Sequence, residues 1–491
     1  ATRVFQGSAG QRTPRRLGSR RNELGQIMST IDPKWAWARY EPSPQHPWDL
    51  RQAGHLYRRA AFGATWAELQ SAIQSGPDAA IDRLVRGGDG TDAFEADTRK
   101  LADPIRKANN GPQSRAWWLY RMLYTPHPLR EKLTLFWHNH FATSNAKVQN
   151  AGYMLGQYDL MYRHALGNFR DLLQDMSKDP AMMVWLDTAK SQKGMPNENY
   201  ARELMELFSL GIGHYTEDDI REAARAFTGW ELKAGRSQFN APQHDTGEKK
   251  VLGETGNWKG DDVVRICLDQ PACPRFIVTK LYQFLISESA PPAPELVAPL
   301  AERFRASGFD FGDLVRTVLR SNLFFSPHAY RQRVKAPVDF ALGIVRGLEG
   351  RVGTTALAVT LEGLGQSVFY PPSVKGWDGG PAWLSGQTLL FRQNLSLALT
   401  STEDDRFGRR CDPAELARRH GQRDDPQIVR FFLGLFLQGD APPETQTRLL
   451  NYLQSARQQR PPRHWTDADA ADHRVRAVCH LVLTLPEFQL D

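Results

Sequence analysis

The feature that most constrains the fold is a succession of capped, amphipathic segments along nearly the whole chain. In segment 48–90, Thr65 is a good N-cap and Glu68, three residues later, completes a capping box. Thr216 and Asp219 repeat that spacing before another apolar run. Apolar residues then recur at the three- and four-residue intervals of an amphipathic helix. The sequence therefore predicts a mainly α protein, built as a multi-helix array.

Prolines and a change of pattern mark where these helices stop. Pro126 and Pro128 divide residues 114–143 into two predicted helices. Residues 231–258 carry Gly, Asn and Asp between short apolar runs, which favours a small β-hairpin or a long loop. Residues 364–386 combine glycine, proline and aromatic residues, and they predict a second long loop.

Charge and length suggest the domain organisation. The chain has 491 residues and a net charge of +7, with an arginine-rich beginning and a body that is close to neutral. We expect residues 1–44 to be a disordered basic leader and N-terminal extension, with Met28 resembling a natural start. Residues 45–491 are predicted to form a single large helical domain, with two helical lobes joined near 231–260 as the alternative. Basic residues do not cluster with aromatic residues outside the leader, so nucleic-acid binding is not expected.

The sequence gives weaker signals about compartment. It contains no run of 18 or more apolar residues, so no membrane span is expected. It lacks a secretory apolar segment, which predicts a cytoplasmic protein as the sequence stands, or an exported one if a signal was removed. Cys267 and Cys273 are six positions apart and fit either a local disulfide or two inert thiols.

Several stretches together resemble one bacterial family, catalogued as domain of unknown function 1800 (DUF1800). They are "AGHLYRRAAFGAT" (53–65), "KLTLFWHNHFATS" (132–144), "NENYARELMELFSLGIGHYTEDDIREAARAFTGW" (197–230), "HDTGEKKVLG" (244–253) and "PPSVKGWDGGPAWL" (371–384). The resemblance implies no settled activity and assigns no role to a residue. It implies proteins that are often exported and whose genes often lie beside those of a sulfatase-like (DUF1501-type) family, which suggests a working partner.

The pair His138 and His140 is the first candidate for chemistry. Residues two apart on a helix point about 200° apart, so both histidines face one site only if the helix ends between them. A core position for one histidine and a site position for the other fits a continuous helix. The letters "HNH" here are contiguous and do not form the nuclease signature of that name.

The segment "NENYARELMELFSLG" is the second candidate. Asn199, Glu203 and Glu206 follow one stripe of the predicted helix, with Arg202 beside them. Two carboxylates one turn apart can ligate a metal or act as acid and base. The same residues also fit a solvated charged face or an internal Arg–Glu network.

Two loops supply the remaining candidates. His244 and Asp245 lie in a predicted loop, where they offer metal ligands or an ordinary turn. Trp377 and Trp383 flank Asp378 in the Gly/Pro/aromatic loop. These residues suit stacking on a sugar, and they suit equally well a loop that fills a hole between helices.

Two hypotheses about function follow. The first is a metal-assisted hydrolase of a polymer or glycan, in which a divalent metal activates water. Its metal ligands would be His138, His140, His244 and Asp245; its catalytic residues Glu203, Glu206, His138 and Arg202; its substrate-binding residues Asn199, Trp377, Asp378 and Trp383. The second is a non-catalytic protein that binds a carbohydrate or the sulfatase-like partner. The Walker A, GxGxxG, GxSxG and CxxC motifs are absent, which removes the usual support for other enzyme classes.

Overall fold

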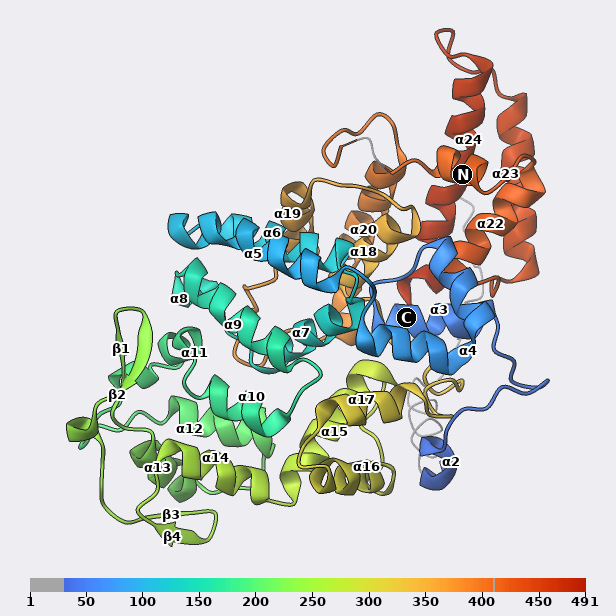
Figure 1. Ribbon diagram of the computed structural model, residues 1–491. Helices are drawn as coiled ribbons and strands as arrows, with labels where there is room; N and C mark the ends of the chain where they lie inside the picture. The colour runs from blue at the N-terminus through green and yellow to red at the C-terminus, as the bar shows by residue number, and fades with distance from the viewer. Residues whose placement is uncertain (1–30, 409–410) are drawn as a thin grey trace, which may run out of the picture.

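The computed structural model describes residues 31–408 and 411–491, which are mainly helical (Figure 1). The first part contains α2 (Pro33–Trp37), α3 (Leu50–Ala60), α4 (Trp66–Arg86), α5 (Thr91–Ala108), α6 (Gly111–Tyr124), α7 (Pro128–His140), α8 (Asn145–Val148), α9 (Ala151–His164), α10 (Phe169–Met176) and α11 (Pro180–Trp185). The middle contains η1 (Thr188–Lys190), α12 (Asn199–Glu203), η2 (Leu204–Ser209), α13 (Glu217–Ala226), β1 (Trp230–Lys233), β2 (Arg236–Phe239), η3 (Ala241–Gln243), β3 (Lys249–Val251), β4 (Glu254–Gly256), α14 (Gly260–Asp269), α15 (Ala272–Leu285), α16 (Pro294–Ala306) and α17 (Phe311–Leu319). The last part contains α18 (Pro337–Gly347), α19 (Thr354–Gly363), η4 (Gly380–Trp383), α20 (Gly386–Thr400), α21 (Pro413–Arg419), α22 (Asp425–Leu437), α23 (Pro443–Gln458), α24 (Asp467–Thr484) and η5 (Pro486–Gln489).

The predicted helix starts are confirmed by their hydrogen bonds. The Thr65 hydroxyl accepts the main-chain N–H of Glu68 at 3.1 Å, and the Glu68 carboxylate accepts the N–H of Thr65 at 2.7 Å. Thr216 and Asp219 make the same reciprocal pair at the start of α13. Each box satisfies two N–H groups that a helix N-terminus leaves without a partner. These boundaries are set by residues three positions apart, which is why the sequence alone predicts them.

The interruption at 231–258 is confirmed as β structure, but it holds two hairpins where we expected one. Strand β1 pairs antiparallel with β2, and β3 pairs antiparallel with β4. The hairpins belong to separate two-stranded sheets. The predicted loop at 364–386 is confirmed as well, with one short turn of 3₁₀ helix, η4, inside it.

The acidic helix differs from its prediction. It is α-helical only over Asn199–Glu203 and then continues as the π-helix η2. The main-chain N–H of Leu210 bonds to the carbonyl of Met205, five residues back, at 3.0 Å. A π turn is wider than an α turn, so the side chains of Glu203 and Glu206 do not follow the single α-helical stripe that we predicted.

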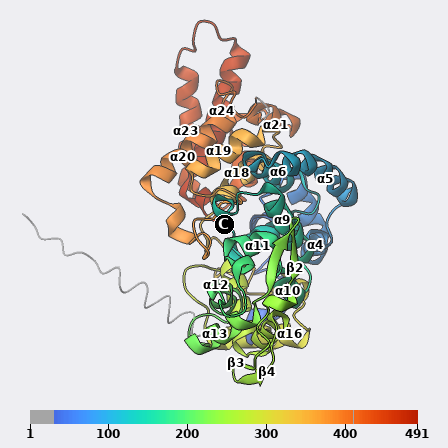
Figure 2. The ribbon, with the colours of Figure 1, turned by 90° about the vertical axis from the view of Figure 1, so that its left-hand side faces the viewer.

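Helix α7 lies near the middle of the molecule. In Figure 1, α12–α17 and the β3–β4 hairpin lie below it, the β1–β2 hairpin lies to its left, and most of α18–α24 lies above it. Figure 2 shows α13, α16 and the β3–β4 hairpin at the bottom of the molecule and α23 and α24 at the top. Helix α7 packs against α3, α4, α6 and α9. One cluster of buried apolar side chains extends from Ala36 to Phe488 and joins these parts. The segment that carries the two candidate histidines is therefore a core element.

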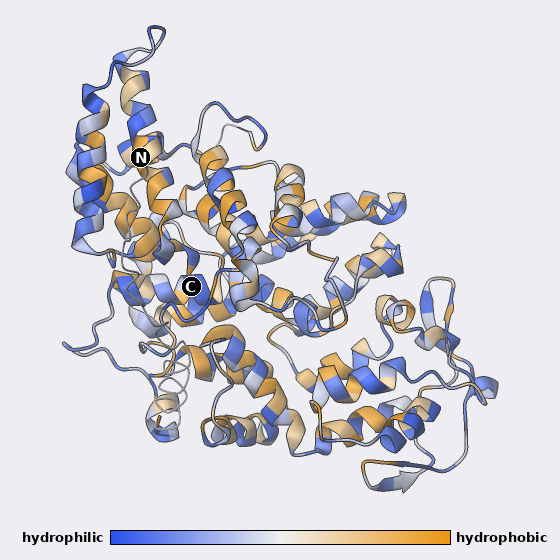
Figure 3. Cartoon of the chain, turned by 180° about the vertical axis from the view of Figure 1, so that it is seen from behind, coloured by the Kyte–Doolittle hydropathy of each residue, from blue (hydrophilic) through white to orange (hydrophobic). Residues whose placement is uncertain are grey.

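The periphery is more polar than this centre. In Figure 3 the far end of the α23–α24 hairpin and the loop that joins these helices are largely hydrophilic, whereas helices near the middle carry many apolar residues. No helix within 31–408 or 411–491 is long and apolar enough to cross a membrane. The predicted disordered leader falls mostly on residues 1–30, outside the described residues, and residues 31–44 contain α2.

The cysteines are all free thiols in the core. Cys267 and Cys273 are both buried and do not form the local disulfide that was one of the two expectations. Burial raises the pKa of the Cys267 thiol to about 12, because the apolar surroundings disfavour the thiolate. The second expectation, two inert thiols, matches this environment.

Candidate functional site: a charged cavity at the end of helix α7

Three consecutive side chains in the last turn of α7 bind two segments that are distant in the sequence. His138 is fully buried, and its Nε2 accepts the main-chain N–H of Phe369 at 3.1 Å. The Oδ1 atom of Asn139 accepts the main-chain N–H of Trp377 at 2.8 Å. The Nε2–H of His140 donates to the carbonyl of Phe208 at 3.1 Å, at the end of the π-helix. The triplet thus positions the Gly/Pro/aromatic loop and η2 around the end of α7.

Burial keeps both histidines neutral. It lowers the pKa of His138 to about 3, and it lowers that of His140 to about 3 with a further contribution from Lys280. The ring of His138 packs edge-on against Trp118 and Trp377, with centroids 5.2 and 5.6 Å away. The two rings have separate duties, as expected for residues two apart on a helix.

Gly376 is required for the loop to approach α7. Its φ is +80°, a conformation that L side chains rarely adopt. A Cβ atom at this position would lie 2.2 Å from Asn139 Oδ1 and would collide with the acceptor of the Trp377 bond. The glycine therefore supplies both the turn and the space for the loop anchor.

A cavity of about 380 Å³ opens where α7, η2, α15 and the loop meet. We call it the α7 cavity; it is lined by Phe136, Asn139, His140, Leu207, Lys280, Gln283, Phe284, Glu288, Arg333, Val374, Lys375, Trp377, Asp378 and Gly379. Its size is within the range typical of small-molecule sites. Three cations and two carboxylates surround it, which leaves an excess of positive charge.

The cations of the α7 cavity differ in how they are held. Arg333 donates to the carbonyl of Phe284 at 2.5 Å, and its Nε lies 3.4 Å from a carboxylate oxygen of Glu288. Lys280 makes no ion pair within the described part of the chain, and its ammonium lies 5.3 Å from the ring centroid of Phe276. Burial lowers the pKa of Lys280, because a desolvated ammonium is disfavoured. Lys375 is exposed on the loop and also forms no ion pair among residues 31–408 and 411–491.

The predicted site residues are distributed as follows. His140, Trp377 and Asp378 border the cavity. Trp377 is 8% exposed and Trp383 is 7% exposed, so both side chains are largely buried. His138 lies behind the cavity wall, in contact with Trp377. The substrate-binding roles predicted for Trp377, Asp378 and Trp383 stay predictions.

The acidic segment lies beside the cavity rather than in its wall, where only Leu207 represents it. Arg202 binds the Glu217 carboxylate through two contacts of 2.8 Å, and Glu206 accepts the Tyr215 hydroxyl at 3.0 Å. Burial, and then the charge of Glu206, raise the pKa of Glu203, while Arg202 and Lys375 oppose the shift. Asn199 is exposed at the start of α12. The catalytic roles predicted for Glu203, Glu206 and Arg202 stay predictions, and so does the substrate-binding role predicted for Asn199.

The remaining metal candidates lie apart from the cavity. The Nδ1–H of His244 donates to the carbonyl of Thr228 at 2.9 Å. Asp245 is held by Arg225 at 2.8 and 3.2 Å, which lowers its pKa to about 2. Across residues 31–408 and 411–491, no group of three or more His, Cys, Asp and Glu side chains is arranged to hold a metal ion. The structure therefore does not bring the predicted ligands His138, His140, His244 and Asp245 together as one set.

Sequence reasoning missed two of the three cations that line the cavity, Lys280 and Arg333. Lys280 interrupts an apolar helical run, "FIVTKLYQFL", and a lone lysine there was the available signal. Arg333 and Glu288 lie in connecting segments that carry no recognisable motif.

Fold and site together define a helical protein with a charged, ligand-sized cavity built around the end of a buried helix. A family model described as "Protein of unknown function (DUF1800)" matches residues 55–490. The chain therefore belongs to the DUF1800 family, as its sequence motifs indicated. No curated protein and no solved structure matches it.

Proposed function

We propose that the α7 cavity binds an anionic group, such as the sulfate, phosphate or carboxylate of an acidic glycan. The observation that carries this proposal is the convergence of Lys280, Arg333 and Lys375 on one hollow, two of them without an ion-pair partner among the described residues. Partly desolvated cations bind anions more strongly than exposed ones. An acidic ligand would supply the negatively charged partner that Lys280 lacks.

Hydrogen bonds from α7 support the walls of the cavity. His138 and Asn139 hold the loop that carries Lys375, and His140 holds the end of η2. A preformed site loses less entropy when a ligand binds, so affinity does not require the loop to order first.

The test compares a charged sugar with its neutral parent. We expect N-acetylglucosamine 6-sulfate to bind in calorimetric titrations and N-acetylglucosamine to bind at least about tenfold more weakly. Lys280→Met keeps an apolar stem and removes the charge, so it should remove this preference. Lys250→Met is the matched control, since Lys250 is exposed on β3 and borders none of the lining residues of the cavity. Equal binding of both sugars, or no effect of Lys280→Met, contradicts the proposal.

A second candidate function retains hydrolysis without requiring a metal. The Glu203 carboxyl has a raised pKa and makes no hydrogen bond in the described part of the chain, close enough to Lys375 for their charges to interact. A carboxyl in this state suits a general acid beside the cavity. Glu203→Gln should then abolish cleavage of a chromogenic sulfated glycoside while the affinity for N-acetylglucosamine 6-sulfate stays within about threefold of wild type.

The predicted sulfatase-like partner fits the same ligand chemistry. A protein that presents sulfated or phosphorylated sugars through the α7 cavity would serve a sulfatase-like enzyme directly. Co-purification of the two proteins, with and without N-acetylglucosamine 6-sulfate, tests this pairing. Failure to co-purify under both conditions removes the partner and leaves the binding proposal to its own test.

A further inference from the structure

A second hollow, larger than the α7 cavity, lies between α5, α6 and two loops of the C-terminal half. Its volume is about 690 Å³. We call it the α6 cavity; it is lined by Phe94, Tyr120, Tyr124, Arg351, Val352, Gly353, Arg406, Phe407 and Gly408. None of these residues borders the α7 cavity, so the two sites can be altered separately.

Aromatic rings form one side of the α6 cavity. Tyr120 and Tyr124 are four residues apart on α6, which places them on one face of the helix, with ring centroids 4.9 Å apart. Phe94 from α5 lies nearly parallel to Tyr120, at an interplanar angle of 11° and a centroid distance of 6.2 Å. Tyr120 remains 37% exposed, although most large apolar side chains of the described residues are buried. This surface offers a flat ligand an apolar face.

Two arginines, Arg351 and Arg406, also line the α6 cavity. Arg406 is already bound to Asp404, with contacts of 2.9 and 2.6 Å to one carboxylate oxygen. Arg351 is exposed and forms no ion pair within residues 31–408 and 411–491. The Tyr124 hydroxyl accepts the main-chain N–H of Val352 at 3.3 Å and so ties the loop of Arg351 to the aromatic helix. This bond therefore keeps the loop that carries Arg351 close to the aromatic face of α6.

We propose that the α6 cavity is a second ligand site, which takes one acidic sugar residue. The pyranose ring would lie against Tyr120, and its carboxylate or sulfate would bind Arg351. Acidic sugars combine an apolar C–H face with a planar or tetrahedral anion, and the cavity presents one complement to each. Its volume is within the range that holds a small ligand. This site goes beyond the proposed function because it requires none of the residues of the α7 cavity.

The experiment measures binding to the full chain by NMR titration. It uses two matched probes, methyl β-D-glucuronide and methyl β-D-glucoside. In the Lys280→Met background, which removes the anion preference of the α7 cavity, the glucuronide should bind more tightly than the glucoside, and adding Arg351→Gln should make the two equal. Tyr120→Ala should weaken binding of both by about tenfold, whereas Tyr120→Phe should keep it within about threefold, because the ring provides the contact. Lys280→Met, in the α7 cavity, should leave the Tyr120-dependent binding unchanged.

Several outcomes would overturn the proposal. These are the absence of glucuronide binding, binding that survives both Tyr120→Ala and Arg351→Gln, and tighter binding of adenosine monophosphate than of the glucuronide. Tyr120 is partly exposed, so its variants should keep the wild-type melting temperature, which a thermal scan verifies. The Lys280→Met measurements separate failure here from failure of the proposed function.

Discussion

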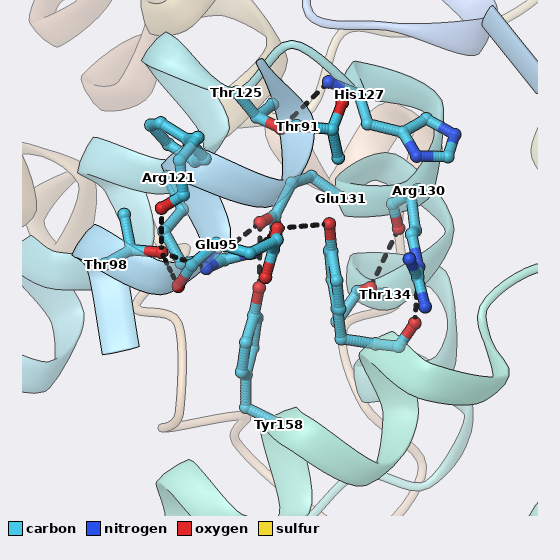
Figure 4. A network of polar contacts seen from close by, with 12 residues as sticks. Thr91, Glu95, Thr98, Arg121, Thr125, His127, Arg130, Glu131, Thr134 and Tyr158 are labelled. Atoms are coloured by element: carbon cyan, nitrogen blue, oxygen red, sulfur yellow. Dashed lines mark hydrogen bonds and ion pairs between the residues drawn. The ribbon is translucent and has the colours of Figure 1, made fainter. Parts of the chain in front are cut away.

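The buried ion network between α5, α6, α7 and α9 gives the sharpest prediction about stability. Arg121 is 1% exposed and donates to Glu131 at 2.7 Å and to Glu95 at 2.6 Å. Glu131, also fully buried, accepts the Tyr158 hydroxyl at 2.7 Å and the Trp118 indole N–H at 3.0 Å. Figure 4 shows Arg121, Glu95, Glu131 and Tyr158 pointing toward one another. One guanidinium thus holds two carboxylates in the core.

Replacing Arg121 with methionine should destabilise the protein by about 3–5 kcal/mol. The methionine fills most of the volume, but it leaves the buried Glu131 carboxylate without its cation, which is the costly half of a broken buried pair. Total stabilities of folded domains are about 5–15 kcal/mol, so this loss is a large fraction of the whole.

The pH dependence of the loss tests the reasoning independently. Burial raises the pKa of Glu131, and Arg121 is the first of the groups that oppose this shift. Without Arg121 the folded-state pKa should rise further above the unfolded value. Stability from such a group is fully present below the unfolded pKa and is lost as pH rises through the folded pKa. The Arg121→Met variant should therefore lose more stability at pH 8 than at pH 5.

The assay is urea unfolding followed by circular dichroism and tryptophan fluorescence. Adding Glu131→Gln to Arg121→Met should recover most of the loss, because the amide still accepts from Tyr158 and carries no charge. Arg106→Met is the control: its partner Asp159 is partly exposed, so its loss should cost less than about 1 kcal/mol. A cost for Arg121→Met no larger than the control, or no recovery in the double variant, would refute the argument.

Three further predictions follow from other parts of the structure. Gly376→Ala should destabilise the loop anchor and weaken binding of N-acetylglucosamine 6-sulfate by about tenfold or more in calorimetry, since its Cβ meets Asn139; unchanged binding would contradict the anchor. Burial raises the pKa of Asp179 from 3.8 to about 7, so wild-type stability should fall as pH rises from about 4 through 7, and Asp179→Asn should flatten this slope in urea titrations. Thiol titration should find all four cysteines slow to react in the folded protein and fully reactive in urea without a reductant; fewer reactive thiols would indicate a disulfide.

Local signals carried most of the fold prediction. The capping box of Thr65 and Glu68 depends on residues three positions apart, and it lies where the sequence placed it. The π-helix was not predictable in this way, because it is defined by main-chain bonds such as Leu210 to Met205 that no residue type dictates. Residue propensities favour an α-helix through the whole segment 199–209. We therefore attribute the wider π turn to the packing of this segment against its neighbours.

The candidate site depended on contacts that no spacing rule reaches. Arg333 and Lys280 meet His140 from segments more than a hundred residues away along the chain. The apolar loop residue Phe369 carries the partner of His138, 231 positions away. The sequence identified the end of α7 and the loop as chemically unusual, but it could not show that His138 and Asn139 bind the loop. The charged cavity forms because these bonds hold the loop against α7.

Because His138, Asn139 and His140 bind two separate segments, they also limit how the chain can change in length. One residue inserted earlier in α7 would rotate the triplet by about 100° and detach the loop and η2 together. Insertions in the hairpins or at the tip of α23–α24 touch no such junction. The fold therefore depends on the register of α7. A shift of one residue in this helix should destabilise the structure more than many single substitutions would.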